Sequence, residues 1–166
     1  MAFEKADLTF NMDDGSLRGA IDGKHISARA GSGGRAGSKT AGATNYFLEN
    51  NPFATSVKLN EKDSKSVGGT LPLGRYLLRT HESRANWLRL VPDSSNAMKS
   101  RAGFAIHGRG KRGSDGCIVP SDFNVVLLLY KLTKAREKAQ KPAPTLDVVA
   151  IGTDVDRKRR QMLYTA

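Results

Sequence analysis

Residues 8–30 read LTFNMDDGSLRGAIDGKHISARA, and this stretch decides the fold class. Leu8, Phe10 and Met12 alternate with polar residues, which is the period of a strand with one buried face. An Asp-Gly pair follows and a second comes further on; such pairs mark turns because glycine accepts a positive φ and aspartate bonds its own backbone. The next two strands are therefore expected at residues 17–20 and 26–30.

Short apolar runs bounded by turn residues recur along the rest of the chain. They predict further strands at residues 75–79, 87–91, 103–107 and 146–151. Beyond Pro120 the spacing of apolar residues changes to that of a helix, with Ser121 as its expected N-terminal cap. The sequence thus predicts a mostly β fold, a β-sandwich or barrel-like sheet, with one substantial helix.

Length and composition favour one domain and a polyanionic environment. The 166 residues suit a single domain, which we place at residues 1–152 with a basic tail at 153–166. Residues 31–44, rich in glycine, alanine, serine and basic residues, are expected to form a mobile surface loop. The net charge of +11 favours polyanions such as an acidic cell-wall polymer. No basic stripe is interleaved with aromatic residues, so we expect no nucleic-acid partner.

The beginning of the chain and its apolar runs bear on localisation. The first ten residues, MAFEKADLTF, lack the apolar stretch of a signal peptide, and no segment approaches the length of a membrane span. We therefore expect a protein that is made in the cytoplasm without a signal peptide and has no membrane span. We also expect it to be a monomer.

Residues 104–120, FAIHGRGKRGSDGCIVP, carry the chemistry that we expect. Cys117 is the only cysteine, and a thiol attacks as its thiolate, so it needs a base or a cation nearby. His107 ends one apolar run and Cys117 opens the next, which lets two adjacent strand ends bring them together. The basic loop between them, with Arg109, is expected to favour the thiolate and an anionic substrate. Gly116 leaves room for a substrate carbonyl, and its N–H and that of Cys117 are expected to face the oxyanion.

Several blocks of the sequence resemble the L,D-transpeptidase family. Ser114-Asp115-Gly116-Cys117 resembles its Ser/Thr-His-Gly-Cys signature, with a histidine on the preceding strand. The block from Arg101 to Gly108, RAGFAIHG, is similar to that of the L,D-transpeptidase-like toxins delivered by bacterial type VI secretion. Further similarities lie at Gly15 and Leu17, at Ser32-Gly33, at residues 69–76 (GTLPLGRY) and at residues 87–92 (WLRLVP).

The resemblance implies a peptidoglycan-modifying cysteine enzyme with the fold of that family. Cys117 is then the nucleophile and His107 its base. The family's second polar helper does not carry over, because Asp115 stands where the family has histidine, and we expect Ser114 or Asp115 to fill that role. Gly116, Gly108, Arg109 and Arg101 are expected to contact the oxyanion or the substrate. The substrate would be a peptidoglycan stem tetrapeptide that loses or exchanges its terminal D-Ala, with no cofactor or metal. A secreted antibacterial effector acting in the periplasm of a target bacterium would also have an immunity protein and a secretion-system component as partners.

Three other interpretations remain open on the residues alone. A wall amidase or endopeptidase of the Cys-His type usually has its cysteine at a helix start and before the histidine, whereas here His107 comes first. A non-enzymatic basic module would bind nucleic acid or an acidic polymer, with no role for Cys117. A metal site made from His25, His81, His107 and Cys117 has no compact ligand spacing. Trp87 is assigned to the core, and His81 to the surface or the edge of the cleft.

Overall fold

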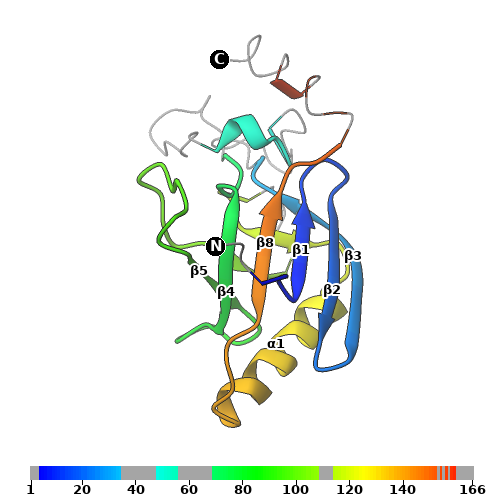
Figure 1. Ribbon diagram of the computed structural model, residues 1–166, viewed down its shortest axis with the longest axis vertical. Helices are drawn as coiled ribbons and strands as arrows, with labels where there is room; N and C mark the ends of the chain where they lie inside the picture. The colour runs from blue at the N-terminus through cyan, green and yellow to red at the C-terminus, as the bar shows by residue number, and fades with distance from the viewer. Residues whose placement is uncertain are drawn as a thin grey trace.

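Eight strands form a closed barrel in this protein (Figure 1). A computed structural model describes residues 4–34, 48–55, 69–108 and 114–152, together with 154, 156, 158 and 159. The barrel order is β1-β2-β3-β7-β6-β5-β4-β8. The elements are β1 (Leu8–Asn11), β2 (Ser16–Ile21), β3 (Lys24–Ser32), the 3₁₀ turn η1 (Pro52–Ala54), β4 (Gly74–Thr80), β5 (Leu88–Pro92), β6 (Ala105–Ile106), β7 (Ile118–Pro120), α1 (Phe123–Lys138) and β8 (Thr145–Val149). The predicted mostly β fold with one substantial helix is confirmed, in the form of a barrel.

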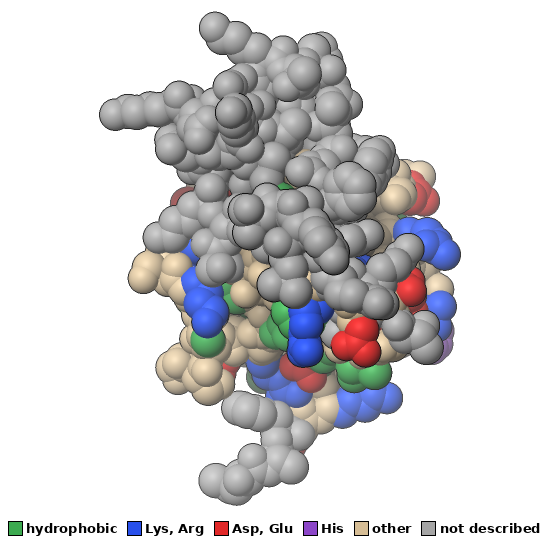
Figure 2. Space-filling model, turned by 90° about the horizontal axis from the view of Figure 1, so that it is seen from above, with side chains coloured by type: hydrophobic (Ala, Val, Ile, Leu, Met, Phe, Trp, Pro, Cys, Tyr) green, Lys and Arg blue, Asp and Glu red, His purple; other side chains and the backbone are tan. Residues whose placement is uncertain are grey.

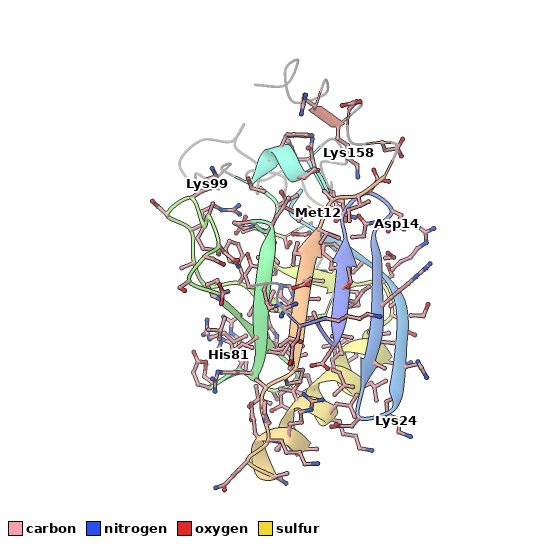
Figure 3. All side chains as sticks on the ribbon, viewed as in Figure 1. Met12, Asp14, Lys24, His81, Lys99 and Lys158 are labelled. Carbon is pink, nitrogen blue, oxygen red and sulfur yellow. The ribbon has the colours of Figure 1, made fainter. Side chains whose placement is uncertain are left out.

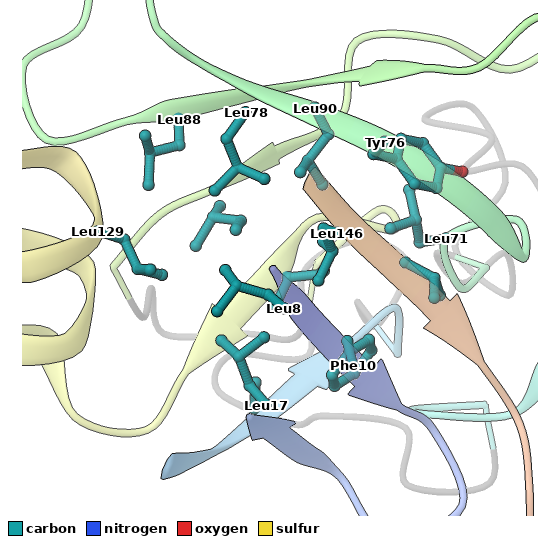
Figure 4. Close-up of a cluster of buried hydrophobic side chains, with 14 of the residues drawn as sticks. Leu8, Phe10, Leu17, Leu71, Tyr76, Leu78, Leu88, Leu90, Leu129 and Leu146 are labelled. Atoms are coloured by element: carbon teal, nitrogen blue, oxygen red, sulfur yellow. The ribbon is translucent and has the colours of Figure 1, made fainter. Parts of the chain in front are cut away.

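The barrel interior is filled by the alternate side chains that the sequence pattern indicates. Leu8 and Phe10 of β1 are fully buried, while Thr9 between them is partly exposed. Tyr76 and Leu78 of β4 follow the same alternation. Figure 4 shows these side chains converging with Leu129 of α1. An eight-stranded barrel is just wide enough for side chains to fill, so the fold is held by a packed apolar core.

Two parallel pairings set the topology. β1 pairs with β8 in parallel, Leu8 opposite Leu146, which joins strands from the two ends of the chain. β6 pairs with β7 in parallel through Ile106 and Ile118. The other neighbours, β1–β2, β2–β3, β3–β7, β4–β5, β4–β8 and β5–β6, are antiparallel. The second parallel pair matters for function because it places residues 105–107 beside residues 117–119.

The helix α1 lies across one end of the barrel (Figure 1). Its cap differs from the prediction: Asp122, and not Ser121, accepts a hydrogen bond from Asn124 N at 2.9 Å. The reason is that β7 continues to Pro120, and Ser121 N still donates to Arg29 O of β3 at 2.9 Å. The helix therefore starts after the sheet contact ends.

Two other segments differ from the sequence prediction. The strand expected at residues 103–107 contains only Ala105 and Ile106, because Gly103 has a φ of +82° and breaks the extended backbone. The surface loop expected at residues 31–44 is wrong at its beginning. Gly31 and Ser32 belong to β3, and the Ser32 side chain is fully buried. Residues 35–44 of that expected loop lie outside the described residues.

Part of the predicted tail contacts the barrel at the end away from α1. The ammonium of Lys158 donates to Met12 O at 2.6 Å and to Asp13 O at 3.1 Å. Figure 3 shows Lys158 and Met12 together at this end, whereas Lys24 and His81 lie near the other end. Among the helices in the described ranges, none has the length and apolar character needed to cross a membrane.

Candidate active site

His107 and Cys117 lie on the outer face of the barrel, on neighbouring strand ends. Ile106 pairs with Ile118, and both side chains are fully buried in the interior. Because side chains alternate along a strand, His107 and Cys117, each adjacent to one of these isoleucines, project to the opposite face. They occupy diagonal positions across β6 and β7. No hydrogen bond between described residues joins the two side chains, and such bonds often tighten only when substrate is present.

Trp87 packs directly on the imidazole of His107. The two ring centres are 4.1 Å apart and the planes differ by 13°. The register explains this contact, since Leu88 pairs with Ile106 and the residues just beyond them, Trp87 and His107, face each other outside the barrel. The assignment of Trp87 to the core is therefore wrong: it is half-buried and belongs to the site. His81 meets the same indole edge-on, with ring centres 5.9 Å apart.

The environment of His107 keeps its ring neutral and oriented. Nδ1 lies 2.7 Å from Gly108 O, so in the neutral ring Nδ1–H donates to this carbonyl and Nε2 is left as the acceptor. Burial is the main cause that lowers the pKa of His107, and the positive charge of Arg84 lowers it further; the hydrogen bond to Gly108 opposes both. In the neutral ring Nε2 is therefore the nitrogen that can accept a proton.

The surroundings of Cys117 favour the thiol over the thiolate. Burial raises its pKa above the ordinary value, and the negative charge of Asp115 adds to this effect. A hydrogen bond with the backbone of Ala105 and the charges of Arg101 and Arg84 act in the opposite direction. Asp115 thus disfavours the thiolate, contrary to an activating role. The loop residues expected to favour the thiolate, Arg109 among them, lie outside the described residues.

Ser114 and Ser32 hold the turn that presents Cys117. Ser114 Oγ donates to Cys117 O at 2.6 Å and accepts from Gly33 N at 3.0 Å. Ser32 Oγ donates to Gly116 O and accepts from Leu71 N, both at 2.9 Å. The hydrogen bonds of these two hydroxyls take the place of the backbone–backbone hydrogen bonds that the turn lacks. Ser114 therefore orients the backbone of the nucleophile instead of touching its sulfur.

Gly116 is required by a close approach and by its backbone. Its φ is +113°, a region that residues with a side chain rarely adopt. A Cβ on Gly116 would collide with the ring of Phe104 and would lie 2.8 Å from Arg101 Nη2. Phe104 and Arg101 thus fill the space where a side chain at position 116 would lie. The Gly116 N–H also points to Ser114 Oγ at 3.4 Å, so it is partly engaged before any oxyanion forms.

Arg101 and Gly108 are both engaged in packing around the turn. The Arg101 guanidinium donates to the carbonyl of Asp115 at 2.8 Å and to that of Gly69 at 3.2 Å, and it also donates to the carbonyls of Thr55 and Thr70. It ties the turn of the nucleophile to the segments at residues 55 and 69–70. A Cβ on Gly108 would lie 2.9 Å from the ring of Phe123, so this glycine lets α1 approach the end of β6.

Metal ligation finds no support in the part of the chain that the structure describes. It contains no group of three or more histidine, cysteine, aspartate or glutamate side chains placed to hold a metal ion. His25 is exposed on β3 and pairs with Ala20 of β2. Figure 2 shows Lys and Arg side chains interspersed with Asp and Glu on the face that it presents.

Comparison with known proteins adds no relative. The chain matches no protein-family model, no curated protein and no solved structure. The case for a function therefore depends on the site itself and on the sequence motifs.

Sequence reasoning missed three residues that shape this site. Trp87 shares its strand parity with polar Arg89, while Leu88 and Leu90 are buried; this alternation was a readable signal that Trp87 faces outward. Ser32 was noted only as part of a motif, and its bond to Gly116 spans 84 residues. Arg84 lies in the hairpin loop between β4 and β5, and no local sequence pattern indicates that it lies near the site.

Proposed function

We propose that this protein is a cysteine acyltransferase of the L,D-transpeptidase type that acts on peptidoglycan stem tetrapeptides. One observation carries the proposal: a thiol and an imidazole lie on the same outer face of two adjacent strands, and the imidazole is oriented with Nε2 as its acceptor. The RAGFAIHG and SDGC blocks, which resemble those of the family, select this class among the cysteine enzymes.

In the proposed reaction the proton moves from Cys117 to His107 as the sulfur attacks. Sγ adds to the carbonyl carbon at the L-centre of meso-diaminopimelate, and Nε2 takes the thiol proton. The C–N bond to D-Ala then breaks, and His107 gives the proton to the leaving amine. Water resolves the thioester to a shortened stem, or an amine resolves it to an exchanged or cross-linked one.

The shifted pKa values favour transfer in step with attack over a resting ion pair. A raised thiol pKa and a lowered imidazole pKa both keep the pair neutral before substrate arrives. Because the Gly116 N–H is already directed at Ser114, we assign the Cys117 N–H as the main oxyanion donor. Ser114 and Arg101 act as positioning residues, since each holds the turn through backbone carbonyls.

The amidase or endopeptidase alternative is less well supported. Its cysteine usually begins a helix, whereas Cys117 immediately precedes the strand β7. We further propose that the protein is an antibacterial effector acting in the periplasm of a target bacterium, with an immunity protein in the producing cell. This part of the proposal depends on the sequence motifs alone. It predicts that loss of the catalytic thiol removes toxicity toward cells that lack the immunity protein.

The activity is tested with purified disaccharide-tetrapeptides, with and without D-Met, under reducing conditions. We expect release of D-Ala or its replacement by D-Met, read by liquid chromatography and mass spectrometry. Cys117→Ala should abolish both products, and His107→Gln should lower the rate by about 10²- to 10⁴-fold. Circular dichroism shows whether each variant is folded. Unchanged muropeptides from folded, reduced protein would exclude the proposed activity and favour a binding module.

A further inference from the structure

Three arginines lie close enough to influence the site, and two of them are already engaged. Arg101 donates to four backbone carbonyls around the turn. Arg89 pairs with Glu82 through Nε at 3.0 Å and through Nη2, which also lies 3.0 Å from His81 Nε2. Arg84 is different: within the described residues its guanidinium has no carboxylate partner, and its side chain is exposed.

Arg84 is nevertheless held in a defined place. Its guanidinium carbon lies 4.4 Å from the centre of the Trp87 ring, the ring on which His107 stacks. The hairpin loop that carries Arg84 is folded over His81, whose Nδ1 accepts from the backbone N–H of Ser83 and of Arg84, each at 3.2 Å. A cation on an aromatic face is attracted by the ring quadrupole, so the contact restrains the side chain without consuming its hydrogen-bond donors.

The position of Arg84 couples it to both reacting groups. Its positive charge lowers the pKa of His107 and also lowers the pKa of Cys117. An exposed cation that is felt at both groups is well placed to meet an anion on the bound substrate. A guanidinium also matches a carboxylate in geometry, because two of its N–H groups can donate in parallel.

The proposed reaction supplies such an anion next to the scissile bond. When the leaving residue is the last one of the peptide, its α-carboxylate is separated from the scissile nitrogen by a single carbon. We propose that Arg84 binds this free C-terminal carboxylate and so restricts the enzyme to peptides that end one residue after the scissile bond. The inference rests on the proposed function. It explains specificity at that end of the substrate: an amidated peptide lacks the charge that Arg84 recognises, and an extended peptide carries it at least one residue further from the scissile bond.

Binding to the inactive Cys117→Ala protein tests this inference without any need for turnover. The ligands are the tetrapeptide L-Ala-γ-D-Glu-meso-diaminopimelyl-D-Ala and its C-terminal amide. The fluorescence of Trp87, the only tryptophan, reports binding, with calorimetry as a second measurement. We expect the acid to bind about 10- to 100-fold more tightly than the amide. Adding Arg84→Ala should reduce the affinity for the acid to that for the amide.

Two further variants sharpen the test. Arg84→Lys keeps a point charge without the planar fork, so we expect an intermediate preference for the acid. Arg18→Ala removes an exposed arginine of β2, a strand whose barrel neighbours are β1 and β3, and should leave both affinities unchanged. Equal binding of acid and amide by the parent protein, a preference that survives Arg84→Ala, or absence of binding by either peptide would each overturn the inference.

The outcome is separable from that of the proposed function. If the active protein releases D-Ala and Arg84→Ala keeps the full preference for the acid, the function holds and the role of Arg84 fails. If Arg84 confers the preference in the binding assay and no peptide is turned over, carboxylate recognition holds and the acyl-transfer activity fails.

Discussion

The barrel frame and the site are built in different ways. The neighbouring strands β1, β2, β3 and β8 have 4, 6, 9 and 5 residues, and ladder hydrogen bonds and buried apolar side chains hold them together. The site strands β6 and β7 have only 2 and 3 residues. There the order comes from a few polar side chains that bond to backbone carbonyls, chiefly Ser32, Ser114 and Arg101. The difference teaches that the site depends on individual polar side chains, whereas the frame depends on its packed apolar interior.

The frame should respond most strongly to loss of an interior side chain. Phe10 of β1 is fully buried inside the barrel, so Phe10→Ala leaves a cavity as well as losing the transfer free energy. We expect the free energy of unfolding to fall by about 3–5 kcal/mol, measured by urea denaturation. Leu73→Ala is the matched control, because Leu73 is exposed and should change the stability by less than about 1 kcal/mol. Equal effects of the two substitutions would contradict the packed-core description.

The turn of the nucleophile should respond to loss of one buried hydroxyl. Ser32→Ala removes the bond to Gly116 O and leaves the N–H of Leu71 without its acceptor. We expect a loss of about 1–3 kcal/mol in the free energy of unfolding. Alkylation of Cys117 by iodoacetamide should become several-fold faster, since the turn loses its tether. Ser27→Ala removes an exposed hydroxyl from the same strand and should alter neither quantity. An unchanged alkylation rate in Ser32→Ala would show that Ser114 alone is enough to hold the turn that carries Cys117.

The smallest effect expected is a displaced pH profile of the thiol. Burial raises the pKa of Cys117, and the thiolate is the reactive form, so folded protein should alkylate more slowly at pH 8 than protein unfolded in urea. The rate should still be rising at pH 9. The unfolded thiol loses its proton first, so the associated stability is present below the unfolded pKa and is lost as the pH rises through the folded pKa. A rate plateau between pH 6 and 8 would indicate a preformed thiolate–imidazolium pair instead.

The sequence predicts the frame better than the site, for a physical reason. Alternation of Leu8, Phe10 and Met12 is a local signal, and burial of one strand face enforces it directly. The glycine before Cys117 and the apolar run before His107 are local signals as well. The structure places His107 and Cys117 on one face of the barrel. The contacts of Ser32 with Gly116 and of Trp87 with His107 depend on which strands become neighbours, and a linear pattern does not contain that information.

The helix cap shows the same limit on a smaller scale. Ser121 has the chemistry of a cap, and the sequence offers no reason to prefer Asp122. Ser121 still takes part in the sheet, because its N–H donates to Arg29 O of β3, and the helix begins beyond it with Asp122 as its cap. A tertiary hydrogen bond thus decides between two local candidates of similar propensity.

The parallel pairing of β1 with β8 has a consequence for synthesis. Leu8 meets Leu146, so the barrel closes only after residues up to Val149 have left the ribosome. Translation proceeds at about 5–20 residues per second, so the first strand waits on the order of ten seconds with one edge unpaired. Contacts between such distant residues also slow folding itself. A nascent chain of this topology is open to capture by a chaperone for most of the time that it takes to make it.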